Sequence, residues 1–284
     1  MNEKPPSAPA KPVDASQKEP PRIVELAAAI YQLRGEKPGS HVYLIKGEAK
    51  NVLIDTGMAA GFSALKSRLA ELGLRVRDID LIILTHEHYD HIGATAYFHP
   101  TAVVAAHRLA ANKVELQDEF VTFRKYRDQS SKPFWVDVWL EDGSVIDLGN
   151  YELDVVHTPG HTSGCICLYE PQGGLLFTGD TVFAGGTLSE IAVGGNVSDY
   201  VNSVRRLSNL KIKKLFPGHG KVSGTPDEDL PKSIVYARTM LDECKTFFEA
   251  FTKTRKLQDK LGSAFGYWAE PGDHQEESAQ QRRT

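Results

Sequence analysis

The sequence is poor in cysteine, with only three among its 284 residues. A small, odd number does not support the framework of disulfide bonds on which small secreted domains depend, and it fits a reducing compartment. The N-terminal region also lacks the continuous apolar core of a signal peptide. We therefore expect a cytoplasmic protein.

Long apolar runs and an excess of positive charge are lacking as well. No run approaches the roughly 20 apolar residues that a membrane-spanning helix needs. The formal net charge is −4, which argues against a nucleic-acid-binding protein that relies on bulk electrostatic attraction. Neither a membrane nor a nucleic acid is expected as a partner.

Both ends of the chain lack an apolar period. Residues 1–21 are rich in proline and polar side chains, and residues 269–284 have the same character. Such segments cannot bury enough apolar surface to fold, so we expect two disordered tails. One domain is predicted between them, over residues 22–268, a length that a single large domain can fill.

Short strands alternate with helices across this predicted domain, which indicates the α/β class. Strands are predicted at residues 23–35, 40–47, 50–57, 78–86, 101–107, 144–149, 151–160, 165–170, 174–180 and 212–220. Helices are predicted at residues 61–74, 198–210 and 226–257, the second of them capped by Ser198. This distribution in two halves favours two mixed β-sheets packed face to face, with helices outside.

A cluster of polar residues follows one of the buried strands. The stretch ILTHEHYDHIGA places His86, His88, Asp90 and His91 within six residues. His86 and His88 are two apart, so on an extended strand end they point the same way. Imidazoles and a carboxylate that converge on one loop suit a divalent metal of the zinc type.

Three further residues of the same chemical kinds end apolar strands elsewhere in the chain. His161 stands in HTPGHTSG, Asp180 in LLFTGDT and His219 in FPGHG, each beside a glycine. Glycine permits the sharp turns that direct a side chain inward. Strand ends that carry His or Asp can converge at one sheet edge.

Taken in order, these motifs resemble the metallo-β-lactamase-fold superfamily of metallohydrolases. The resemblance covers about residues 23–220 and rests on THEHYDH, PGHTSG, FTGDT and PGHG, with NVLIDTG as an early strand. It implies an αβ/βα sandwich with a metal site at one edge. It also implies two zinc ions per chain, although iron or manganese could use such ligands. The implied ligands are His86, His88 and His161 for one metal, Asp90, His91 and His219 for the other, and Asp180 as the bridge.

The resemblance further implies a dinuclear metallohydrolase that attacks a carbonyl with a metal-bridged hydroxide. Asp90 would be the catalytic residue that orients the nucleophile and passes its proton to the leaving group. Asp55 would support the ligand loops without binding metal. The expected substrates are small molecules: acyl thioesters, lactones or activated esters, as for glyoxalase II, thioesterases and acyl-homoserine lactonases.

Two positions separate branches of the superfamily. The diiron oxidoreductases that resemble this fold carry a glutamate at the position of His88, and Glu87 is expected to point away from the metals. The true β-lactamases carry a cysteine in place of Asp180 or lack this bridging carboxylate. Hydrolysis of a thioester, lactone or ester is therefore favoured. An iron-containing oxidoreductase, a β-lactam or phosphodiester hydrolase and a non-catalytic binding protein remain as alternatives.

Two segments lie where they could line a substrate pocket. Residues 114–139 carry Phe120, Phe123, Tyr126, Phe134, Trp135 and Trp139. They could form a lid over an apolar acyl group, a packing element, or a contact that makes the protein a homodimer. The glycine-rich stretch at residues 184–196 could form another wall. His157 could support His161, and Cys165 and Cys167 are interpreted as packing residues.

Overall fold

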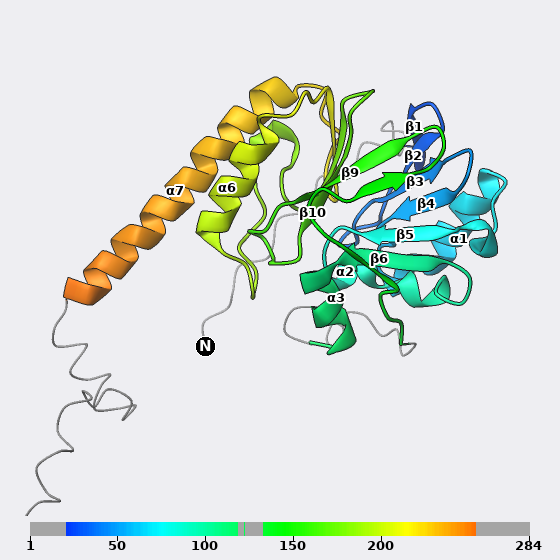
Figure 1. The fold of residues 1–284 in the computed structure, drawn as a ribbon, viewed down its shortest axis with the longest axis horizontal. Helices are drawn as coiled ribbons and strands as arrows, with labels where there is room; N and C mark the ends of the chain where they lie inside the picture. The colour runs from blue at the N-terminus through cyan, green and yellow to red at the C-terminus, as the bar shows by residue number, and fades with distance from the viewer. Residues whose placement is uncertain (1–20, 119–121, 123–132, 254–284) are drawn as a thin grey trace, which may run out of the picture.

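The computed structural model describes residues 21–118, 122 and 133–253 (Figure 1). Within them, one sheet has seven strands and the other has five. The first contains, in spatial order, β1 (Ile23–Ala27), β2 (Ile30–Leu33), β3 (Val42–Lys46), β4 (Asn51–Ile54), β5 (Leu81–Leu84), β6 (Val103–His107) and β7 (Val138–Leu140). The second contains β12 (Lys214–Pro217), β11 (Leu175–Gly179), β10 (Ile166–Glu170), β9 (Glu152–His157) and β8 (Val145–Asp147).

Both sheets are mixed. In the first, β1 to β4 are antiparallel and β4 to β7 are parallel. In the second, β8 to β11 form an antiparallel meander, to which β12 adds a parallel strand beside β11. Because β11 and β12 are parallel neighbours, their carboxyl ends meet at the same sheet edge.

The helices flank the two sheets. They are α1 (Phe62–Glu71), α2 (Tyr89–Ile92), α3 (Arg108–Glu115), α6 (Val197–Leu207) and α7 (Pro226–Lys253), with the short 3-10 turns η1 (Ala59–Gly61), η2 (Val76–Asp78), η3 (Thr95–Tyr97) and η4 (Ala184–Gly186). Figure 1 shows α6 and α7 side by side next to the second sheet, whereas α1 and α3 lie next to the first. No helix in the described part of the chain combines the length and apolarity needed to cross a membrane.

Three apolar clusters hold the layers together. The central one lies between the sheets and includes Ile45, Ile83 and Phe177. A second joins the first sheet to α1 and α3, and a third joins the second sheet to α6 and α7. Burial of continuous apolar strands on both faces explains why strands such as LIIL in β5 show no polar alternation. The predicted αβ/βα sandwich of two mixed sheets is confirmed.

Two local predictions are wrong. Residues 23–35 form the hairpin of β1 and β2 instead of one strand, because Ala29 adopts a left-handed φ of 57° and reverses the chain. The N-cap of α6 is Asn196 and not Ser198. The Asn196 carboxamide oxygen accepts hydrogen bonds from the main-chain N–H groups of Ser198 and Asp199, at 2.8 and 3.2 Å.

The aromatic segment at residues 114–139 is described only in part, and Phe120, Phe123 and Tyr126 lie outside the described residues. At its end, Phe134 packs against the cluster under the first sheet. Trp139 lies on β7, an edge strand, and is exposed, as is Trp135. The described end of the segment therefore contributes a strand to the sandwich.

Candidate metal centre

All seven predicted ligand residues lie at one edge of the sandwich. Each follows the end of a strand or belongs to the short helix α2. His86 and His88 follow β5, α2 carries Asp90 and His91, His161 follows β9, Asp180 follows β11 and His219 follows β12. The two sheets are joined at this edge, because the main-chain N–H of Ile166 donates to the carbonyl of Thr85 at 2.9 Å.

One group of three histidines could hold a metal ion. The nearest nitrogen atoms of His86, His88 and His161 lie within 4.8 Å of one another, and all three side chains are buried. Nε2 of His161 is 2.9 Å from Nδ1 of His88. Three imidazoles that converge in this way match the three-protein-ligand arrangement typical of catalytic zinc.

A second group lies beside the first. Asp90, His91 and His219 also place one ligand atom each within 4.8 Å of the others. Nε2 of His219 is 3.0 Å from Oδ2 of Asp90 and 3.2 Å from Nε2 of His91. This group is less buried, because the side chains of Asp90 and His219 are partly exposed and Asp90 borders the pocket opening.

The carboxylate of Asp180 lies between the two groups. Its Oδ1 is 3.3 Å from Nε2 of His91, and its Oδ2 is 3.6 Å from Nε2 of His219 and 3.9 Å from Nε2 of His161. The site lacks room for any side chain at Gly218, where a Cβ would lie 2.5 Å from Oδ1 of Asp180. The Asp180 carboxylate is thus within 4 Å of imidazole nitrogens from both groups.

Asp55 orients His91 from behind the site. Its Oδ2 lies 2.8 Å from Nδ1 of His91. The Asp55 carboxylate also accepts two hydrogen bonds from Thr85, both at 2.8 Å. The main-chain N–H donates to Oδ1 and the hydroxyl donates to Oδ2. An imidazole that donates from Nδ1 to a carboxylate presents the lone pair of Nε2 on its other side. The supporting role expected for Asp55 agrees with these contacts.

Two other histidines are oriented in the same manner. Nδ1 of His161 lies 2.6 Å from the carbonyl oxygen of Glu190. Nδ1 of His86 lies 3.2 Å from the hydroxyl of Thr85, which is free to accept because its proton goes to Asp55. In each case Nε2 is left as the nitrogen without a proton, directed at the cluster.

Sequence reasoning did not find Thr85 or Glu190, and it offered His157 as the support of His161. Nε2 of His157 instead contacts the carbonyl of Ser163, and its ring stacks on that of His107 with 3.8 Å between the ring centroids. A main-chain carbonyl such as that of Glu190 leaves no side-chain signal in a sequence. The only hint was the glycine-rich stretch at 184–196, proposed as a pocket wall. Its residues Ser189 and Glu190 do line the pocket.

Burial keeps most of the imidazoles neutral. Together with a smaller contribution from neighbouring imidazoles, it lowers the pKa of His86 well below its ordinary value and that of His88 to about 3. His91 differs: burial alone would lower its pKa, but Asp180, Asp55 and Asp90 raise it well above the ordinary value. Neutral imidazole is the form that binds a metal, and a metal ion would replace the proton on His91.

The donor set fits a divalent metal. Nε2 of His86 is buried and has no hydrogen-bond partner among the described residues, an arrangement that is costly unless something else occupies its lone pair. Glu87 does not join the cluster, as expected, and accepts a hydrogen bond from the hydroxyl of Thr162 at 3.0 Å. A pocket of about 420 Å³ opens over the cluster, bordered by Pro38 and Tyr89 among others.

Replacement of Asp55 by asparagine tests its positioning role. The carboxamide would donate to Nδ1 of His91, which moves the imidazole proton to Nε2, the nitrogen that faces the cluster. We expect Asp55→Asn to weaken zinc binding about 10- to 100-fold, measured by competition with a chelator. Asp80→Asn is the control, because Asp80 also accepts a main-chain hydrogen bond, from Asn51 at 2.7 Å. Equal zinc affinity in the two variants would contradict the role.

Comparison with known proteins identifies relatives over most of the described chain. A model of the metallo-beta-lactamase superfamily matches residues 36–219. The chain is 31% identical over 216 residues to the acyl-coenzyme A thioesterase MBLAC2 of Homo sapiens, across 65% of this chain and 74% of that protein. It is 34% identical over 202 residues to the probable metallo-hydrolase MJ0888 of Methanocaldococcus jannaschii, across 68% of this chain and 93% of that protein.

Solved structures agree on the fold. A metallo-beta-lactamase family protein from Thermus thermophilus superposes with a TM-score of 0.66 at 24% identity, across 77% of this chain and 82% of that one. BJP-1, a subclass B3 metallo-beta-lactamase of Bradyrhizobium japonicum, superposes with a TM-score of 0.60, also at 24% identity, across 82% of this chain and 96% of that one. The resemblance predicted from the motifs is thus confirmed, and the chain belongs to the metallo-beta-lactamase superfamily.

Proposed function

We propose that this protein is a metal-dependent hydrolase that cleaves acyl thioesters, with lactones and activated esters as related substrates. The observation that carries the proposal is the Asp180 carboxylate between two complete groups of ligand residues. The thioester is placed first because an acyl-coenzyme A thioesterase is among the relatives at 31% identity.

Two zinc ions would occupy the site. His86, His88 and His161 would hold one ion, Asp90, His91 and His219 would hold the other, and Asp180 would contact both. Histidine nitrogen with carboxylate oxygen is a donor set that zinc favours, and iron or manganese accepts it too. When bound, such a metal pair lowers the pKa of a water molecule and polarises a carbonyl oxygen.

Side chains of the protein would carry out the proton transfer and shape the substrate pocket. Hydrolysis adds water across the carbon–sulfur bond, so one proton must travel from the attacking water to the leaving thiolate. Oδ2 of Asp90 would take this proton and return it to the sulfur, because Asp90 borders the pocket and its Oδ2 lies within the second group of ligand residues, 3.0 Å from Nε2 of His219. Ser189 and Glu190 would close the pocket on the side of His161.

Metal content is the first test. We expect protein produced with zinc to carry close to two ions per chain by elemental analysis, because both groups of ligand residues and the carboxylate between them are present. His88→Ala should lose metal together with activity. A content near one ion despite excess zinc would rule out the dinuclear proposal. Iron with oxygen uptake would favour the oxidoreductase alternative.

Asp90→Asn tests the proton transfer. The carboxamide keeps the size of the side chain but cannot accept the proton, so we expect turnover to fall at least about a hundredfold. Circular dichroism and metal content are measured on the same sample, since loss of metal would also lower the rate. Near-normal turnover at full metal content would show that Asp90 is not the proton carrier.

A substrate panel tests the class of reaction. Acyl-coenzyme A thioesters, acylglutathione, acyl-homoserine lactones, nitrophenyl esters and nitrocefin are compared by kcat/KM. We expect an acyl thioester to rank first, because Asp180 and the thioesterase relative both favour this branch over β-lactam hydrolysis. If nitrocefin ranked first, the thioesterase assignment would be wrong while the metal centre could stand.

A further inference from the structure

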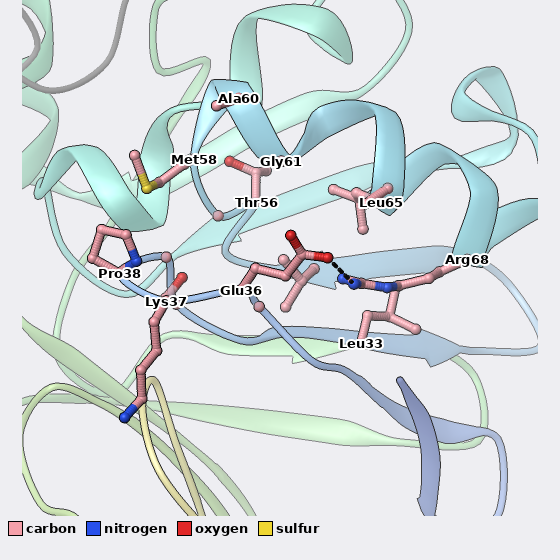
Figure 2. A pocket seen from close by; sticks show the side chains of 16 residues that line it. Leu33, Glu36, Lys37, Pro38, Thr56, Met58, Ala60, Gly61, Leu65 and Arg68 are labelled. Carbon is pink, nitrogen blue, oxygen red and sulfur yellow. Dashed lines mark ion pairs between the residues drawn. The ribbon is translucent and has the colours of Figure 1, made fainter. Parts of the chain in front are cut away.

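A second cavity, of about 220 Å³, lies next to the metal centre. It is enclosed by the loop between β2 and β3, the segment that follows β4, and one face of α1 (Figure 2). Pro38 borders both this cavity and the pocket over the metal ligands. The two spaces are therefore neighbours that share Pro38 as a wall residue.

Hydrogen bonds attach the wall of this cavity to the metal-ligand segment. The hydroxyl of Ser40 donates to the carbonyl of Asp90 at 2.8 Å, and the hydroxyl of Thr56 donates to the carbonyl of His91 at 3.0 Å. Both Ser40 and Thr56 line the cavity. A group bound in the cavity would thus lie directly behind helix α2.

The walls of the cavity are mostly apolar. Leu33, Val42, Met58 and Leu65 contribute aliphatic or thioether surface. Figure 2 shows Met58 and Pro38 on one side of the cavity and the guanidinium of Arg68 on the other. An acyl chain that passed Pro38 would meet aliphatic groups first and a positive charge at the far side.

Arg68 is the unusual member of this lining. It is only 6% exposed, and burial of a guanidinium is costly unless an anion lies beside it. One of its amino groups donates to the main-chain carbonyl of Arg34. Its carboxylate partner is Glu36, at 3.5 Å, whose side chain is 72% exposed. A carboxylate so open to water is a weak partner that another anion can displace.

From this geometry we infer that the cavity is a specificity pocket for acyl groups that end in a carboxylate, with Arg68 as the binding residue. The inference rests on the proposed thioester hydrolysis. The thioester carbon would lie at the metal centre, the methylene groups would contact Leu33, Met58 and Leu65, and the distal carboxylate would pair with Arg68. Glu36 occupies that place when no such substrate is bound.

This arrangement predicts a preferred length. The metal ligands and Arg68 both belong to the buried framework, so the span between them is set by the fold. A chain that is too short cannot reach the guanidinium, and a longer one must buckle. Preference for a terminal carboxylate should therefore peak at one chain length.

The experiment compares pairs of coenzyme A thioesters with equal numbers of acyl carbons. Glutaryl is paired with pentanoyl, adipoyl with hexanoyl and suberoyl with octanoyl. The thiol is the same throughout, so a difference in kcat/KM reports on the acyl end alone. The quantity measured is the ratio of kcat/KM for the carboxylated substrate to that for its neutral partner, in the metal-loaded protein.

Three variants decide the outcome. Arg68→Met should lower the ratio at the preferred length at least about tenfold, because a charge-assisted hydrogen bond is lost. Glu36→Gln should raise it a few-fold, because the competing carboxylate is removed. Lys66→Met removes a charge from an exposed position on the same helix and should leave the ratio unchanged.

The proposal is overturned if the wild type prefers the neutral substrate at every length, or if Arg68→Met and Lys66→Met give the same ratio. Should Arg68→Met fail to fold, a ratio that does not rise in Glu36→Gln overturns it. Should no thioester be hydrolysed at all, the proposed function fails, and calorimetric titration with adipate tests the pocket separately. Adipate should then bind the wild type and bind Glu36→Gln more tightly; the absence of binding overturns the pocket as well.

Discussion

The buried carboxylate of Asp55 makes the contacts on which the candidate metal centre depends. It accepts two hydrogen bonds from Thr85 and lies 2.8 Å from Nδ1 of His91, so it joins the end of β4 to the segment that follows β5. The carbonyl of Thr85 in turn accepts from Ile166 in the second sheet. One short network thereby holds both sheets together at the edge where the ligand residues lie, and it also sets which nitrogen of His91 faces them.

Electrostatics explains why such a crowded cluster is stable inside the protein. Neutral imidazoles concentrate lone pairs without concentrating charge. The carboxylates of Asp90 and Asp180 bring the negative charge, and His91 partly balances it. Burial would raise the pKa of Asp180, but His91, with smaller contributions from His219 and His161, holds it below its usual range. Nε2 of His86 remains buried without a hydrogen bond in the described structure, and a cation would satisfy its lone pair. Metal binding would therefore be linked to the folding of this edge.

The proposed specificity pocket is built on the same segments that position the candidate metal ligands. Ser40 and Thr56 donate to the main-chain carbonyls of the predicted ligands Asp90 and His91 and also line the neighbouring cavity. Chemistry and recognition would then share one rigid framework. Glu36 is the exposed and replaceable part of it, whereas Arg68 is buried.

By itself the sequence determined the chemical kinds and order of the predicted ligand residues. His86, Asp180 and His219 each follow an apolar strand, so their presence at strand ends could be predicted from local pattern, as could the layered fold.

Tertiary structure alone decided the rest. The hairpin at Ala29 depends on a left-handed φ that alanine rarely adopts, and the support of His161 comes from a main-chain carbonyl. The pairing of Arg68 with Glu36 joins a helix face to an earlier loop, where only the packing of α1 on the sheet brings them together. Local patterns are set by neighbours in the chain, whereas such contacts arise from distant segments that meet only after burial of the core.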